Sequence, residues 1–340
     1  MLSLFFRSSA YFTSFVLLWR LSLASSPDSL TTTDGCALGQ PLQSMGMLQA
    51  ASRMNNSWGG LGSRRRRTFA APISATRLES REVLMAKIAK FVYTFAAPAG
   101  PWVLAKTWDQ RSQFFGGKDR LAIYQSGNQC VVAFAGTDDV SDLSDDLDVR
   151  DKEACGHSFH KGIYEEFQNF LSGKKWSSEF QPYLKSDACS GGIIAVGHSL
   201  GGALASVLAT CANAPGNPLG TQLGFLITSL YTIGAPALAK SSPRNGQTSS
   251  GCFNGARFFI EDSQTYDPVS YAAVRIGFEH PRVKAIRLHS DSDDRLSFDT
   301  FSCESDEARL NSDEPGMQFP SKNDHLATTY ISRIEKLFVE

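Results

Sequence analysis

Apolar residues recur along the chain in two patterns from residue 74 onward. Stretches with a helical period cover residues 78–95, 161–184 and 202–208. Short runs that are apolar at almost every position occupy residues 121–124, 130–134, 193–196, 226–233, 256–260 and 283–288. Such runs predict strands buried on both faces, and their alternation with helices predicts an α/β fold with a mostly parallel central sheet between helices. The first two runs flank a Ser-Gly-Asn turn and predict a β-hairpin.

The first 67 residues lack this alternation. Arg7 precedes a short apolar run (residues 11–19), and small residues follow the run. This order predicts a secretory signal peptide over residues 1–24, because the run is too short to span a bilayer. An organellar transit peptide is the alternative, since residues 1–70 hold twelve serines and few acids.

Residues 25–67 are rich in Ser, Gly, Thr and Met and show no sustained period. Such a segment cannot bury enough apolar surface to offset its ordering entropy, which predicts a disordered leader. It ends in four arginines (residues 64–67), which are either a solvated charge block or the cleavage site of a processing protease. In the second case the leader is a propeptide, and a folded body remains over residues 68–340.

Composition and charge limit the classes of protein that the chain can belong to. With 42% hydrophobic and 20% charged residues, it is neither a disordered polymer nor a multi-span membrane protein. The formal net charge is −1, although residues 1–70 carry seven arginines against two aspartates. A balance so close to zero offers no electrostatic footprint for nucleic acid, so no nucleic-acid partner is expected.

The seven cysteines lie in different contexts. Cys36 lies in the leader, and Cys130 opens a strand-like run. Cys211 shares a helical spacing with Leu204 and Leu208, which predicts a small core residue. The remaining four suit two disulfides of a secreted protein, with three connectivities open: Cys155, Cys189, Cys252 and Cys303. No C-x-x-C pair or clustered His/Cys spacing occurs, so no zinc site is expected.

The sequence Gly197-His198-Ser199-Leu200-Gly201 has the G-x-S-x-G spacing. That pattern is weak by itself, but an apolar run (residues 191–196) precedes it and a tightly packed helical stretch (residues 202–208) follows it. This strand–turn–helix order is the context of a nucleophile elbow, which presents the serine hydroxyl at the carboxyl end of the sheet. The alternative is a glycine-rich turn between packed elements.

A serine hydroxyl needs a base to take its proton and an acid to orient that base. On a fold with this elbow, the acid follows the serine in the chain and the histidine comes last. Asp267 precedes Pro268 and fits a turn just beyond the predicted strand 256–260, at the same sheet edge as Ser199. Asp262 is the rival acid, and its place next to the strand is also consistent with a solvated strand end.

Three histidines follow Ser199 in the chain: His280, His289 and His325. His325 lies in a loop that runs into the final helix and is free to reach back over the site, so it is the predicted base. His280 and His289 are predicted to be surface residues at a turn and at a strand end.

Acyl transfer also requires two N–H donors for the developing oxyanion. Leu200, the residue after the serine, supplies one of them. The second is expected from the loop after the apolar run 130–134, where Gly136 permits a sharp turn and Thr137 can add or orient a donor.

Several motifs in a fixed order resemble the fungal-type class 3 lipase family of α/β-hydrolases. The matching segments are residues 131–137, 160–164, 196–205 and 232–236, followed by acid-loop and histidine-loop segments at 267–269 and 325–330. Together they cover roughly residues 74–340, and motifs in order are more specific than any one of them. The resemblance implies an α/β-hydrolase fold, a triad of Ser199, Asp267 and His325, an oxyanion hole framed by Thr137 and Leu200, and no metal or organic cofactor.

Residues 138–148, where this family often has a lid, hold six aspartates. Val140, Leu143 and Leu147 would share one face of a helix there, which makes them the candidate apolar face of a lid. The alternative is an ordinary solvated acidic loop.

These features predict a secreted or endomembrane-lumenal serine esterase that hydrolyses carboxylic esters of lipids, most of all acylglycerols, through an acyl-serine intermediate. Phospholipase A1-type action, hydrolysis of aryl or cell-wall esters and acyl transfer to another alcohol stay open, because they use the same triad. A non-catalytic binding protein is the alternative from another class, since fold alone does not establish function. The expected partners are a lipid or ester substrate and a transient lipid interface, without a transmembrane span.

Overall fold

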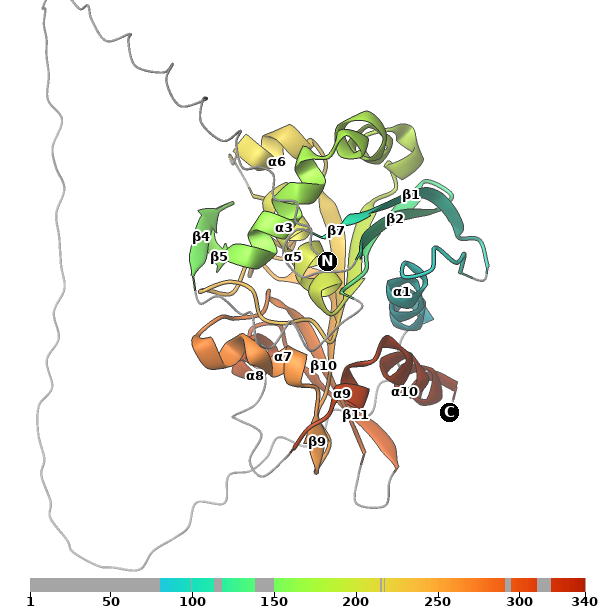
Figure 1. Ribbon diagram of the computed structural model, residues 1–340. Coiled ribbons are helices and arrows are strands. Elements are labelled where there is room, and N and C mark those ends of the chain that lie inside the picture. The colour runs from blue at the N-terminus through green and yellow to red at the C-terminus, as the bar shows by residue number, and fades with distance from the viewer. Residues whose placement is uncertain are drawn as a thin grey trace, which may run out of the picture. The chain divides into compact units, whose positions relative to one another are not determined.

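The computed structural model describes residues 80–98, 100–112, 118–137, 150–214, 216, 218–290, 295–310 and 319–339. Its centre is an eight-stranded sheet (Figure 1), in the order β1 (Val103–Arg111), β2 (Lys118–Ser126), β3 (Gln129–Phe134), β6 (Ile193–His198), β7 (Ile227–Ile233), β8 (Phe253–Ile260), β10 (Val283–Ser290) and β11 (Leu296–Phe301). The strands from β3 to β10 in this order are parallel, and those at both edges pair antiparallel. The predicted hairpin and parallel sheet are confirmed.

Helices cover both faces of this sheet (Figure 1), namely α1 (Ser80–Phe91) and α10 (Ala327–Val339) on one face, and α3 (Lys161–Ser172) and α5 (Leu200–Ala212) on the other. In β3, Val131 and Ala133 pack in the same core as α1 and α10. Val132 and Phe134 pack in the core of α3 and α5. Successive strand residues point to opposite faces, so burial on both faces requires the uninterrupted apolar run.

Shorter elements complete the described fold: the hairpin of β4 (Asp151–Ala154) and β5 (His157–His160), the pair β9 (Thr265–Tyr266) and β12 (Phe319–Pro320), a π-helical turn (Trp176–Phe180), two 3-10 turns (Asp187–Cys189 and Val274–Ile276), and the helices α4 (Gln181–Leu184), α6 (Pro218–Leu223), α7 (Pro268–Ala272), α8 (Asp306–Leu310) and α9 (Lys322–His325). The helical stretch predicted over 161–184 is interrupted at Gly173, which has an extended backbone. A side chain there would collide with the ring of Trp108.

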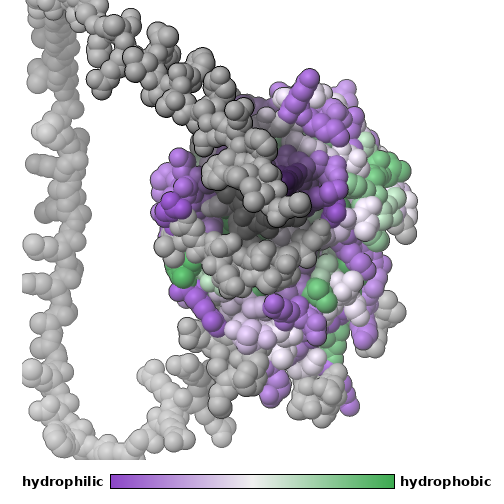
Figure 2. All heavy atoms as spheres, viewed as in Figure 1, coloured by the Kyte–Doolittle hydropathy of each residue, from purple (hydrophilic) through white to green (hydrophobic). Residues whose placement is uncertain are grey.

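Polar residues predominate on the one face of the described residues that Figure 2 displays. On that face the hydrophobic areas between them are small. The large apolar side chains exposed in this part of the chain are Val103, Leu226 and Leu326. Across the described residues, no helix is both long and apolar enough to cross a bilayer.

Three disulfides connect separate elements: Cys130–Cys189, Cys155–Cys211 and Cys252–Cys303. The prediction of two bridges among four loop cysteines is therefore wrong. Cys211 was expected to be a plain core residue, but it is bonded to Cys155. A helical spacing shows that a residue faces the core, and it carries no information on which distant segment packs there. Cys36 lies outside the described residues.

The bridge from Cys155 to Cys211 spans 56 residues and ties the β4–β5 hairpin to α5. We predict that replacing both cysteines by alanine lowers the free energy of unfolding by about 2–5 kcal/mol, because the unfolded chain regains the entropy of an open loop. Urea denaturation of the double variant measures this. An unchanged midpoint with an unchanged slope would contradict the bridge.

Candidate active site

Ser199 lies at the junction of β6 and α5, with φ 58° and ψ −135°. This backbone conformation is unfavourable for a residue with a side chain and persists only where the surroundings enforce it. The elbow glycines are required by close packing: a Cβ at Gly197 would lie 2.2 Å from the Gly201 oxygen, and one at Gly201 would lie 2.2 Å from the Phe134 oxygen. The predicted strand–turn–helix elbow is therefore present.

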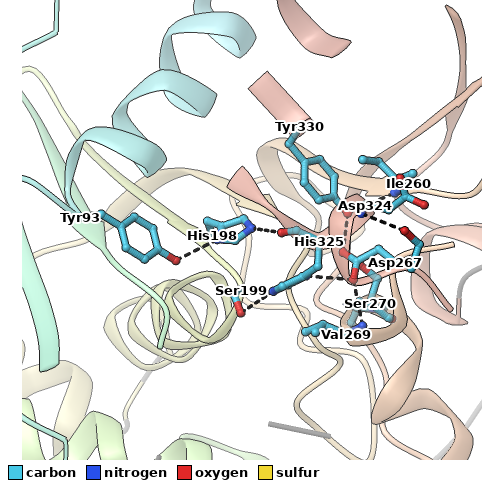
Figure 3. A network of polar contacts seen from close by, with 12 residues as sticks. Tyr93, His198, Ser199, Ile260, Asp267, Val269, Ser270, Asp324, His325 and Tyr330 are labelled. Atoms are coloured by element: carbon cyan, nitrogen blue, oxygen red, sulfur yellow. Dashed lines mark hydrogen bonds and ion pairs between the residues drawn. The ribbon is translucent and has the colours of Figure 1, made fainter. Parts of the chain in front are cut away.

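Ser199, His325 and Asp267 form one hydrogen-bonded row (Figure 3). His325 Nε2 lies 2.8 Å from Ser199 Oγ, and His325 Nδ1 lies 2.9 Å from Asp267 Oδ1. The sequence separations are 126 and 58 residues, so only the tertiary fold brings the three side chains together. None of the three side chains is more than 1% exposed, so the whole row is buried.

Asp267 caps the N-terminus of α7, where its Oδ1 accepts a hydrogen bond from Val269 N at 2.9 Å. Its Oδ2 accepts from Ser270 Oγ at 3.0 Å and from Tyr330 Oη at 2.6 Å. Complete burial raises the pKa of this carboxyl, but His325, Tyr330 and the Val269 N–H outweigh burial and hold the pKa below its ordinary value. The carboxylate is therefore ionised and oriented towards the imidazole.

The rival acid Asp262 has a different place. It forms a two-pronged ion pair with Arg333 on α10, at 2.9 and 2.7 Å. Arg333 also contacts Asp324, the neighbour of His325, at 3.3 Å. Asp262 is thus mostly buried rather than a solvated strand end, and it anchors the segment that carries His325.

The expectation that His280 is a surface residue is wrong. Its side chain is fully buried, and its Nε2 lies 3.2 Å from the Ser270 oxygen. Burial and the nearby charge of Arg257 lower the pKa of His280 well below its ordinary value. His289 is partly exposed on β10, with its Nε2 3.2 Å from Asp299. Neither imidazole hydrogen-bonds to Ser199 in the described structure.

His198 and Tyr93 are two further polar residues at the site that the sequence patterns did not indicate. The buried His198 lies next to His325, with ring centroids 4.9 Å apart (Figure 3). Burial and the neighbouring His325 lower the pKa of His198 to about 3, so its ring is neutral. The only available signal was the polar residue at the second position of the elbow.

The two residues predicted to frame the oxyanion hole adjoin, in the chain, positions at or close to the serine. Leu200 is the first residue of α5, so its N–H has no acceptor within that helix. Thr137 is buried and follows Gly136, where a Cβ would lie only 2.7 Å from Ser199 Cβ. The loop therefore contacts the serine. The lid candidates Val140, Leu143 and Leu147 lie outside the described residues.

One group of potential metal ligands occurs in the part of the chain that the structure describes, formed by Cys252, Cys303 and Glu304. Because the two cysteines are joined in a disulfide, they offer no thiolate. This group therefore does not fit a metal ion.

Comparisons with known proteins agree with this geometry. The profile of the family described as Lipase (class 3) matches residues 131–248. Solved structures of similar fold include the Rhizomucor miehei triacylglyceride lipase (19% identity, TM-score 0.54, 75% of this chain and 97% of that one). A lipase of Rhizopus microsporus var. chinensis is also similar (19% identity, TM-score 0.53, 78% and 92%), as is lipase II of Rhizopus niveus (16% identity, TM-score 0.51, 74% and 95%). No curated protein sequence matches the chain.

The solved structures establish the α/β-hydrolase fold, and the family profile spans the elbow. Together they define the class of the protein as a carboxylic ester hydrolase of the lipase type. Residues 131–248 of the chain are thus similar to the class 3 lipase family.

The two neutral buried histidines predict loss of stability in acid. Below about pH 6.5 the unfolded chain protonates His198 and His280 while the folded chain does not, so the free energy of unfolding falls with pH. We predict that His280→Gln, which keeps a donor for Ser270, reduces this slope near pH 5 by about one proton, or about 1.4 kcal/mol per pH unit. Urea unfolding at several pH values tests this, and equal slopes would contradict it.

Proposed function

We propose that the protein is a serine esterase that hydrolyses carboxylic esters of lipids through an acyl-serine intermediate. The observation that carries the proposal is the hydrogen-bonded row from Ser199 through His325 to Asp267. The chain order serine, aspartate, histidine is that of this fold class.

In this mechanism His325 Nε2 takes the proton of Ser199 Oγ as the oxygen attacks the ester carbonyl. The N–H groups of Leu200 and Thr137 stabilise the oxyanion, and His325 then donates its proton to the departing alcohol. Water, activated by the same imidazole, hydrolyses the acyl-enzyme. Asp267 fixes the tautomer of His325 and stabilises its protonated form, without itself becoming protonated.

Acylglycerols are the proposed substrates within the lipid esters. The family profile supports a lipid ester, and the triad serves phospholipid, aryl or cell-wall esters equally well. Residues 138–148 remain the proposed lid segment, with Val140, Leu143 and Leu147 as its apolar face. The 1% exposure of Ser199 supports an opening step before substrate enters.

Secretion or an endomembrane lumen is the proposed location. Three disulfides fit an oxidising compartment. We infer a targeting segment over residues 1–24, a leader or propeptide over 25–67 and the catalytic domain over 68–340. A transit peptide to an organelle is the alternative.

We predict that Ser199→Ala, His325→Ala and Asp267→Asn each lower kcat by about 10³- to 10⁶-fold on a p-nitrophenyl ester. Ser199→Ala combined with His325→Ala should be about as damaging as either alone, because the triad acts as a unit. A fluorophosphonate probe should label Ser199 in the unchanged protein.

His289→Ala is the matched histidine control and should retain nearly full kcat, because its imidazole faces Asp299. Asp262→Asn should lower stability through Arg333 and lower kcat far less than Asp267→Asn. Undiminished hydrolysis by folded Ser199→Ala would contradict the assignment of Ser199 as the nucleophile. No hydrolysis and no labelling of Ser199 in the unchanged protein would instead favour a non-catalytic binding protein.

A further prediction concerns the lipid interface. Few large apolar side chains are exposed on the described surface, and the proposed lid segment carries six aspartates. We therefore expect ready hydrolysis of soluble and neutral esters, weak interfacial activation and poor action on anionic phospholipid vesicles. The rate should rise smoothly as a short-chain triacylglycerol passes its solubility limit. A sharp jump at the onset of emulsion would contradict this expectation.

A further inference from the structure

Two side chains outside the triad connect the loop before Thr137 with the backbone of His325. Gly136 N lies 2.9 Å from Tyr93 Oη, which in turn lies 2.8 Å from His198 Nδ1. On its other side, His198 Nε2 lies 2.7 Å from the His325 carbonyl oxygen (Figure 3). The three contacts form a continuous chain of hydrogen bonds across the site.

The ends of this chain determine the direction of every hydrogen bond. The Gly136 N–H can only donate, so Tyr93 Oη accepts from it and donates its own proton to His198 Nδ1. The His325 carbonyl can only accept, so His198 Nε2 carries the ring proton. A neutral imidazole satisfies both requirements, and burial keeps His198 neutral.

Close packing supports the same connection. A Cβ at Gly136 would lie 2.7 Å from Ser199 Cβ, 2.8 Å from the His198 oxygen and 2.8 Å from Tyr93 Oη. The backbone of Gly136 therefore touches the serine, the elbow and the tyrosine at once. Tyr93 follows α1 in a turn whose backbone N–H groups donate to carbonyls of that helix. These hydrogen bonds fix the backbone that carries the Tyr93 ring.

We propose that Tyr93 and His198 are positioning residues. They hold the loop that contains Gly136 and Thr137, the oxyanion loop, at a fixed position relative to the base His325. The inference deepens the proposed function and rests on it. Because the Gly136 N–H is committed to Tyr93, the donor of this loop to the oxyanion is the N–H of Thr137. Movement of that loop weakens transition-state stabilisation more than substrate binding. Loss of these hydrogen bonds should therefore lower kcat and leave KM nearly unchanged.

The test begins with Tyr93→Phe, which keeps the ring and removes the oxygen. We expect kcat on p-nitrophenyl butyrate to fall about 10- to 100-fold, with KM within about two-fold of the unchanged protein. Affinity for a boronic acid transition-state analogue should fall by the same factor as kcat/KM. Tyr124→Phe is the matched control, because Tyr124 is also buried on this face of the sheet and its Oη has no hydrogen-bond partner among the described residues.

His198 provides an independent arm of the test. Gln keeps an N–H donor for the His325 carbonyl and Leu does not, so His198→Gln should retain more kcat than His198→Leu. If the hydrogen bonds from Gly136 to His325 act as a unit, Tyr93→Phe combined with His198→Leu should lower kcat about as much as the worse single change. Losses that multiply would mean two independent structural roles and would overturn the proposal.

Equal kcat for folded Tyr93→Phe and Tyr124→Phe would also overturn it. Melting temperatures of all variants separate a loss of fold from a loss of positioning, and the His198 pair keeps the test decisive if Tyr93→Phe unfolds. Fluorophosphonate labelling of Ser199 in the unchanged protein separates the two levels of inference. Labelling there with no effect of Tyr93→Phe removes only the positioning role, whereas no labelling removes the proposed function itself.

Discussion

The backbone of Ser199 is the constraint on which the site depends. A φ of 58° for a residue with a side chain costs about 1–3 kcal/mol, and the packing around the elbow has to impose it. Ser199 N donates to the Ile233 oxygen on β7, and Gly201 lies directly against the end of β3. The neighbouring parallel strands β3, β6 and β7, together with α5, therefore fix the position of the Ser199 hydroxyl.

A second requirement is the control of charge among buried side chains. Asp267 stays ionised because four donors, including His325, compensate for its complete burial. His198 stays neutral because burial disfavours the protonated, cationic form of its ring and the neighbouring His325 lowers its pKa further. One carboxylate therefore faces one imidazole that can accept a proton, while the second imidazole serves as a fixed donor to a carbonyl group.

Local pattern was sufficient for much of the fold. The apolar runs of β3, β6, β7, β8 and β10 were recognisable because strands buried on both faces leave no place for polar residues. The edge strands β1 and β11 were not predicted, since partial exposure admits polar residues at many positions. The same limit explains His280 and Asp262, whose burial depends on distant segments that cover them.

By itself the sequence determined the elbow and its serine, because strand, turn and helix signals are local and the glycines are required where elements nearly touch. The tertiary structure alone decided which cysteines pair, that Asp262 is an anchor, and that Tyr93 and His198 join the oxyanion loop to His325. These depend on contacts between residues far apart in the chain, such as the 105 residues between Tyr93 and His198. Local sequence periodicity does not determine which distant side chain contacts a given position, because that contact depends on how the sheet and its helices pack.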